Sequence, residues 1–427
     1  MVTELRINQK YLWLIIFSQI SVVIYYVGYF HEHLYLPAPF IYNKADTFMD
    51  FFHTAFWANY DFMGRYLIWE SVYPPLNFIF CKYVLVLFGP TEPFFDAFAL
   101  RNHGVGLWYF ILALFFFCAL GAARLTSELR PQFKTSLLFL LIVFSPAFFF
   151  TLERGNLIVI SLPLLACLFW QKKSYQYLTM ALLINLKPYF VLFLLLFIFK
   201  HRWRCLLKAI AVAGSIYLLT GLSLGPDFPY FFVNLFNFSG EAQLFSPREL
   251  LSFPSSISAF SEAIETMRVT GFRSHLVGIP LDAVAFLVKW ANLFVCICLI
   301  VLVAKLCAGK RFSDNYALAV FLVVLTNVSF MTGGYTLIFY PLLVPIFLGG
   351  QFSKLSLYCL IAILLPLDII TLHTENLPSQ NVFLSEQSLD VSYNFSLGQI
   401  IRPLANFTLM LTLIRSSALE LQKKTIS

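Results

Sequence analysis

The chain is organised in long blocks of apolar residues that are separated by short polar or basic turns. A helix needs about 20 mostly apolar residues to cross a bilayer, and several of these blocks approach that length. The pattern therefore predicts an all-α polytopic integral membrane protein, a bundle of roughly 10–13 membrane helices of which some are half-length. The apolar runs are residues 11–30, 75–89, 104–122, 135–151, 156–171, 177–199, 206–221, 281–304, 315–330, 335–349, 355–371 and 397–414.

Composition supports the same class of protein. Of the 427 residues, 59% are hydrophobic and 12% are charged, whereas soluble domains have about 45–50% apolar and about 25% charged residues. The net charge of +7 suits contact with anionic lipid head groups and not with nucleic acid. The eight cysteines form no C-x-x-C pair, so the sequence supports neither a disulfide framework nor a zinc site.

The distribution of basic residues indicates the orientation of the bundle. Arg6 and Lys10 precede the first apolar run, so we expect a cytoplasmic N-terminus. The first run has no small-residue cleavage site and is predicted to be a retained span. Residues 31–74 then lie on the extracytoplasmic side.

Two polar interruptions set residues 135–199 apart from the other apolar sequence. They are Glu153-Arg154-Gly155-Asn156 and Lys187-Pro188. An ionisable residue at membrane depth costs about 2.5–3.5 kcal/mol on insertion scales, so such residues are usually paired or face a wet cavity. Arg154 and Lys187 together indicate an anion site. The structural alternatives are an internal Glu153–Arg154 ion pair, a helix cap at Asn156 and a snorkelling Lys187.

The charge pattern predicts that residues 177–199 form a hairpin of two half-length helices. Basic residues at 172–173 and 200–208 flank this run, so both of its ends should lie in the cytoplasm. Each half is about 15–18 Å long, enough to reach mid-membrane with Lys187 at the tip. Residues 135–171 are expected to form a similar hairpin, with the polar tetrad at its turn.

One topological conflict stays open. If 75–89 and 104–122 both cross the membrane, the basic residues between 124 and 134 lie outside, against the charge rule. Either 75–89 does not cross, or 177–199 crosses once.

The first outer segment contains a predicted amphipathic surface helix. At 100° per residue its polar and apolar residues separate onto two faces. The polar face holds Asp46, Asp50, His53, Thr54 and Asp61, and the apolar face holds Phe48, Phe52, Ala55 and Phe56. A carboxylate on this helix can act as a general base, and a solvated anchoring face is the alternative. Tyr73-Pro74-Pro75 follows as a rigid helix start.

Several short motifs resemble those of one enzyme family. In chain order they are Asp50-Phe51, Tyr73-Pro74-Pro75-Leu76, Ser145-Pro146, Gly155-Asn156, Leu186-Lys187-Pro188 and Lys200-His201-Arg202-Trp203-Arg204. This series, within residues 45–210, is similar to that of family 87 glycosyltransferases, which resemble polyprenol-phosphate-mannose-dependent α-mannosyltransferases of the GT-C superfamily. The chain departs from the family at Arg154, where Gln or a similar residue is common.

The resemblance implies an inverting transfer of a sugar, expected to be mannose, from a polyprenyl-phosphate donor to a lipid-linked or glycan acceptor. Asp50 would be the general base, with Asp46 as the alternative. Tyr73, Arg154, Asn156, Lys187 and His53 are the expected substrate-binding residues. No cofactor, metal ion or nucleic acid is expected, and the partners are the donor, the acceptor and membrane lipids. We expect a bacterial inner membrane, with the active site facing outward.

The expected organisation is a GT-C-like catalytic membrane module at 1–221, an extracytoplasmic loop at 222–280 and C-terminal membrane helices at 281–427. Two other functions remain open from the residues alone. A lipid-linked glycan flippase or transporter also uses half-helices with charged tips. A polysaccharide polymerase or ligase would use outer-loop arginines, for which Arg248, Arg268 and Arg273 are candidates.

Overall fold

The computed structural model describes most of the chain, with gaps. The described residues are 2–33, 47–60, 64–92, 94–129, 133–170, 175–241, 290, 297, 301, 314–328, 333–348, 352–381 and 388–425. Asp46, Asp61, Arg248, Arg268 and Arg273 lie outside them, as does most of the predicted run at 281–304.

Within the described residues, three helices are long and apolar enough to cross a membrane, and one bent pair also passes when it is taken as a single span. The three helices are α1 (Val2–His33), α6 (Val105–Leu129) and α12 (Trp203–Leu224), and the bent pair is α7 (Thr135–Val143) with α8 (Pro146–Arg154). Large apolar side chains such as Leu219 and Leu222 on α12 point out of the protein. Lipid is the solvent that suits such a surface. The predicted helical membrane fold is confirmed, with a two-stranded sheet within residues 371–396 as an addition to it.

The remaining elements are mostly short helices. They are α2 (Met49–Tyr60), α3 (Gly64–Leu67), α4 (Pro75–Phe88), α5 (Ala97–His103), η2 (Leu157–Ile160), α9 (Ser161–Trp170), α10 (Gln176–Leu186), η3 (Pro188–Leu194), α11 (Leu195–Phe199), α13 (Tyr230–Glu241), α16 (Asp314–Val328), η7 (Gly333–Leu343), α17 (Val344–Ile346), α18 (Lys354–Leu364), η9 (Leu367–Ile369), β1 (Thr371–Asn381), β2 (Ser388–Ser396) and α19 (Leu397–Thr425).

The continuous apolar run at 135–151 suggests one helix. The structure instead has two helices there, whose axes are bent by 60°. The break falls at Ser145-Pro146. Pro146 has no backbone N–H and occupies the first position of α8, where none is needed. The Ser145 hydroxyl accepts a hydrogen bond from the Phe148 N–H at 3.2 Å and caps the new helix. The proline therefore decides where the run turns.

The predicted hairpin at 177–199 is present. Arg202 Nη1, beyond the hairpin, donates to Gln176 Oε1 at its start at 2.7 Å. The two ends of the run therefore lie side by side. Lys187 lies at the turn, between α10 and η3. α12 then runs beside α10, and Asn185 Nδ2 donates to the Ala213 carbonyl at 3.0 Å.

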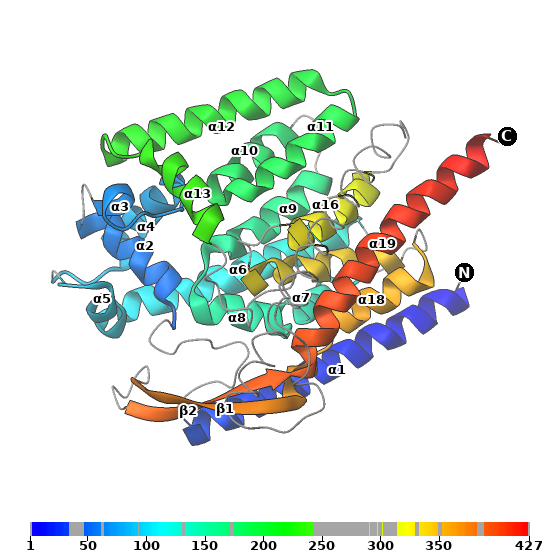
Figure 1. Ribbon diagram of the computed structural model, residues 1–427, viewed down its shortest axis with the longest axis horizontal. Helices are drawn as coiled ribbons and strands as arrows, with labels where there is room; N and C mark the ends of the chain where they lie inside the picture. Colours follow the sequence, from blue (N-terminus) through cyan, green and yellow to red (C-terminus); the bar gives the residue numbers. More distant parts are fainter. Residues whose placement is uncertain are drawn as a thin grey trace.

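The segment from α2 to α5 stays together at one end of the molecule (Figure 1). The start of α6 packs against the end of α4, where a Cβ at Gly106 would lie 2.4 Å from the Phe88 carbonyl oxygen. α4 has only 14 residues, about 21 Å of helix. This arrangement agrees with the alternative in which 75–89 does not cross.

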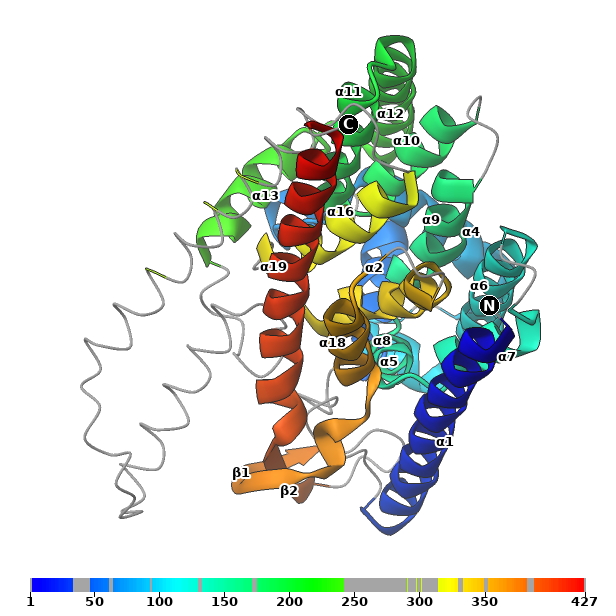
Figure 2. The ribbon, with the colours of Figure 1, turned by 90° about the vertical axis from the view of Figure 1, so that its right-hand side faces the viewer.

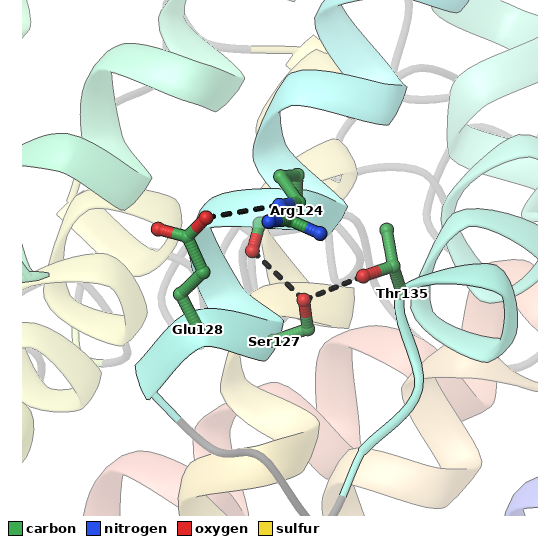
Figure 3. Close-up of polar contacts among 4 residues, drawn as sticks. All are labelled: Arg124, Ser127, Glu128 and Thr135. Carbon is green, nitrogen blue, oxygen red and sulfur yellow. Dashed lines mark hydrogen bonds and ion pairs between the residues drawn. The ribbon is translucent and has the colours of Figure 1, made fainter.

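A polar cluster joins the far end of α6 to α7 (Figure 3). Arg124 Nε donates to Glu128 Oε1 at 2.9 Å, one helical turn further on. The Ser127 hydroxyl donates to the Arg124 carbonyl and lies 2.6 Å from the Thr135 hydroxyl. These bonds fix the reversal between the two helices.

The polar stretch at 372–396 forms an antiparallel hairpin of β1 and β2, in which Glu375 pairs with Tyr393. The hairpin lies at the end of the bundle opposite the two chain termini (Figures 1 and 2). One apolar core joins α1 to the C-terminal α19. The proposed domain boundaries remain predictions.

A closed polar triangle is buried among the C-terminal helices. Asn406 Nδ2 donates to Thr326 Oγ1 at 2.9 Å, and the Thr326 hydroxyl lies 2.7 Å from the Tyr340 hydroxyl. The Tyr340 hydroxyl donates to Asn406 Oδ1, which closes the ring. The triangle links α16, η7 and α19, and its three side chains are buried.

We predict that Asn406→Leu lowers the free energy of unfolding by about 1–3 kcal/mol, because it leaves two buried hydroxyls with fewer partners. Thermal unfolding of the purified protein measures the change. Thr408→Val is the control on the same helix, since the Thr408 hydroxyl donates to the Leu404 carbonyl of its own helix and, within the described ranges, makes no bond to another helix. Equal melting temperatures for Asn406→Leu and wild type would contradict the prediction.

Candidate active site

Asp50 lies in the first turn of α2 and is half-buried. Its Oδ2 accepts hydrogen bonds from Asn156 Nδ2 at 2.7 Å and from the Tyr335 hydroxyl at 2.9 Å. Among the described residues, both hydrogen bonds to this carboxylate reach Oδ2. The part of the chain that the structure describes places no hydrogen bond on the second oxygen, Oδ1.

Asn156 is oriented by the helix that it begins. Its Oδ1 accepts from the Ile158 N–H at 3.0 Å as the cap of η2. Because the oxygen is used by this cap, the amide nitrogen is turned toward Asp50. The same side chain therefore caps η2 through its oxygen and binds the Asp50 carboxylate through its nitrogen.

Gly155 brings the α8 end close to the start of α2. Its φ of +64° is left-handed, a conformation that ends helices and favours glycine. A Cβ here would lie 3.1 Å from Phe51 Cβ and 3.2 Å from the Phe48 carbonyl oxygen. The Phe48 N–H in turn donates to the Glu153 carbonyl at 2.5 Å. The absence of a side chain thus allows Asp50 and Asn156 to meet.

Arg154 ends α8 and is buried, with 7% of its surface exposed. Its Nε donates to the Tyr335 hydroxyl at 3.4 Å, and this hydroxyl donates to Asp50. The Tyr335 ring stacks on Phe150, with centroids 4.9 Å apart. A cation at a helix C-terminus also interacts favourably with the helix dipole. Tyr335 therefore bridges the cation and the carboxylate.

Lys187 reaches the same site from the hairpin tip. Its Nζ lies 4.2 Å from the centroid of the Tyr73 ring, a cation–π contact. Asp50 is close enough to interact electrostatically with both Lys187 and Tyr73. Asn77 holds the tip in place, because its Nδ2 donates to the Leu186 carbonyl at 3.1 Å and the Pro74 carbonyl at 3.2 Å.

The structure thus brings together five residues that the sequence singles out: Asp50, Tyr73, Arg154, Asn156 and Lys187. His53 has a different environment, since its ring stacks on Trp57 at 5.2 Å and meets Phe98 edge-on. Asp46, the alternative base, lies outside the described residues.

Sequence reasoning missed Tyr335. It lies 285 residues from Asp50 along the chain, so no local pattern links the two. A signal exists in Gly333-Gly334, an uncharged break in apolar sequence that immediately precedes the tyrosine. A break at that position marks irregular backbone, which is tolerated at membrane depth only where it is buried or lines a cavity.

The helix α2 also differs from the expected surface helix. It starts at Met49, so Phe48 lies before it with a left-handed φ of 62°. Thr54 is fully buried instead of facing outward, and its hydroxyl donates to the Asp50 carbonyl at 2.7 Å. Phe51 and Phe52 are also fully buried. The neighbouring helices α4 and α5 cover α2, which sequence periodicity does not reveal.

We predict that Gly155→Ala lowers the free energy of unfolding by about 1–3 kcal/mol, because a Cβ is strained at this φ and crowds Phe51. Thermal unfolding measures the loss. The control is Gly214→Ala in α12, where nothing lies within 4 Å of the added Cβ. This control should leave stability unchanged or raise it by up to about 1 kcal/mol. Equal effects of the two substitutions would refute the special role of Gly155.

Comparison with known proteins places these features in one family. The family model of glycosyltransferase family 87 matches residues 84–341, more than half of the chain. The matched region includes Arg154, Asn156, Lys187 and Tyr335, and begins after Asp50 and Tyr73. No curated protein and no solved structure matches the chain. The chain therefore belongs to glycosyltransferase family 87, and because it has helices that are long and apolar enough to cross a membrane, it is a membrane glycosyltransferase.

Proposed function

We propose that this enzyme transfers a sugar from a polyprenyl-phosphate donor to a lipid-linked or glycan acceptor on the extracytoplasmic face, with inversion at the anomeric carbon. The observation that carries the proposal is the meeting of one carboxylate with two cations, Arg154 and Lys187, in a membrane glycosyltransferase. Mannose as the sugar, a GT-C type of architecture and a bacterial inner membrane belong to the same proposal.

Asp50 is the proposed general base. A base must accept the proton of the acceptor hydroxyl as that oxygen attacks the anomeric carbon. The hydrogen bonds from Asn156 and Tyr335 orient the carboxylate through Oδ2, which supports a role for Oδ1 toward the acceptor. The reaction forms a bond between the acceptor oxygen and the anomeric carbon, Asp50 takes the proton of the acceptor hydroxyl, and the bond from the anomeric carbon to the phosphate oxygen breaks to release polyprenyl phosphate.

Arg154 and Lys187 are the proposed partners of the departing phosphate. Cleavage increases the negative charge on the phosphate, and fixed cations stabilise this charge most in a site of low dielectric. Arg154 offers a planar pair of donors and Lys187 a point charge. The contact of Lys187 with Tyr73 supports this role, because it holds the ammonium group near Asp50 and allows it to approach a phosphate.

Sugar transfer accounts for the charged hairpin tips without transport. Membership of a glycosyltransferase family favours an enzyme over a flippase or transporter. The polymerase or ligase alternative rests on Arg248, Arg268 and Arg273, which lie outside the described residues, so no contact supports it.

We predict that Asp50→Asn lowers turnover by about 10²–10⁴-fold while the protein still folds, because an amide cannot take the proton. The assay follows release of polyprenyl phosphate from a labelled polyprenyl-phosphate sugar in the presence of a membrane extract that supplies the acceptor. Asp46→Asn is the matched variant. Normal turnover for Asp50→Asn together with an inactive Asp46→Asn would move the role of base to Asp46.

We predict that Lys187→Met lowers turnover by about 10²–10³-fold, because the departing phosphate loses a fixed positive charge. Lys208→Met is the matched control, since Lys208 also lies over a tyrosine ring, that of Tyr177 at 5.6 Å, but away from the site at the other end of the hairpin. The same assay checks both variants. Equal losses in the two would show that Lys187 contributes only general stability.

A further inference from the structure

Three aromatic rings form a stack that begins one helical turn after Asp50. The His53 ring stacks on Trp57, with centroids 5.2 Å apart and planes inclined by 6°. Trp57 stacks in turn on Trp69, at 5.6 Å and 17°. Trp69 is half exposed, with 49% of its surface accessible. We call these three residues the aromatic stack.

The stack lies on the face of α2 that carries the proposed base. Asp50, His53 and Trp57 are spaced i, i+3 and i+7, which places them on one side of a helix. They span about 10 Å along the helix axis. Asp50 therefore lies within about 10 Å, along the helix axis, of the level of Trp57, which is within the reach of an extended ligand.

A buried arginine fixes the far end of the stack. Arg65 is 3% exposed and donates through Nε to the Trp57 carbonyl at 2.9 Å. Its Nη1 donates to the Leu224 carbonyl at the end of α12, also at 2.9 Å. Arg65 thereby ties α3, and Trp69 just beyond it, to the end of α2. The hydrogen bonds of Arg65 therefore hold Trp69 in a fixed position relative to α2.

Glu70 directly follows the half-exposed tryptophan in the chain. It is exposed and has a φ of 45°, a left-handed conformation that is strained for a residue with a side chain. Residues held in such conformations cluster at functional sites. The end of the stack therefore combines a flat aromatic ring with a carboxylate.

We infer that the aromatic stack and Glu70 form a subsite for a sugar residue of a glycan acceptor. One face of a pyranose ring carries C–H groups and packs on a flat aromatic ring, while its hydroxyls hydrogen-bond to groups such as a carboxylate. The inference rests on the proposed function for the acceptor that it serves. It names the class of that acceptor as one with at least one sugar ring beyond the reacting hydroxyl.

The ionisable residues distinguish this subsite from a lipid contact. Leu67 and Ile68 next to Trp69 are exposed and also suit a membrane interface. A lipid chain against the stack would leave His53 and Glu70 in an apolar medium, which is costly for polar groups and most of all for a carboxylate. A hydrated glycan keeps both groups solvated. The ligand class that fits all four groups is therefore a carbohydrate.

Direct binding to soluble oligosaccharides tests the inference. The full-length protein is placed in phospholipid nanodiscs free of sugar-based detergent and titrated with mannotriose, maltotriose and chitotriose by saturation-transfer difference NMR. We expect saturable binding of at least one trisaccharide. Trp69→Ala should raise its Kd roughly 3- to 10-fold, because the stacking face is lost. Trp69→Leu should raise it as much, since leucine is apolar but has no ring.

Trp203→Ala is the matched control, because Trp203 is equally exposed (52%) but begins α12 at the other end of the bundle. It should leave the Kd unchanged, and thermal unfolding confirms that each variant folds. Absence of binding by all three trisaccharides overturns the inference, as does wild-type affinity in Trp69→Leu, which is the result for a membrane anchor. The titration needs no donor, so its failure is distinguishable from a failure of transfer by the Asp50-dependent mechanism.

Discussion

Polar groups inside an apolar bundle must find their partners within the protein, and the candidate site is organised by this requirement. The partners of Asp50 are Asn156 and Tyr335, which donate hydrogen bonds to it. The partner of Lys187 is the face of the Tyr73 ring. These partners fix the carboxylate and the ammonium group without using all of their bonding capacity. The remaining capacity is what the proposed phosphate-linked donor and acceptor hydroxyl would need.

The same groups stand where helices are interrupted. Asn156 follows the left-handed Gly155, Lys187 lies between α10 and η3, and Tyr335 lies in the first turn of η7. An interrupted helix leaves backbone groups without intrahelical partners, so its break must be buried against protein or face a polar cavity. Breaks from separate parts of the chain therefore gather at one place. The side chains beside them gather as well, and they form the site.

One short helix links the two substrates in this scheme. The α2 helix begins with the proposed base and continues with His53 and Trp57, and Arg65 ties Trp69 to its far end. A donor phosphate near Arg154 and Lys187 and a glycan along the aromatic stack would meet at Asp50. Burial of Phe51 and Phe52 on the other side of α2 holds the helix rigid between them.

The sequence by itself determined the membrane class and the hairpin at 177–199, and it singled out Asp50, Arg154, Asn156 and Lys187 as candidates, because apolar run length and polar residues in apolar sequence are local signals. Only the tertiary structure decided that Tyr335 bridges Arg154 and Asp50, and that His53 turns to Trp57. Helical periodicity predicts which residues share a face. It does not predict what packs against that face, since contacts between distant segments depend on how all the helices fit together.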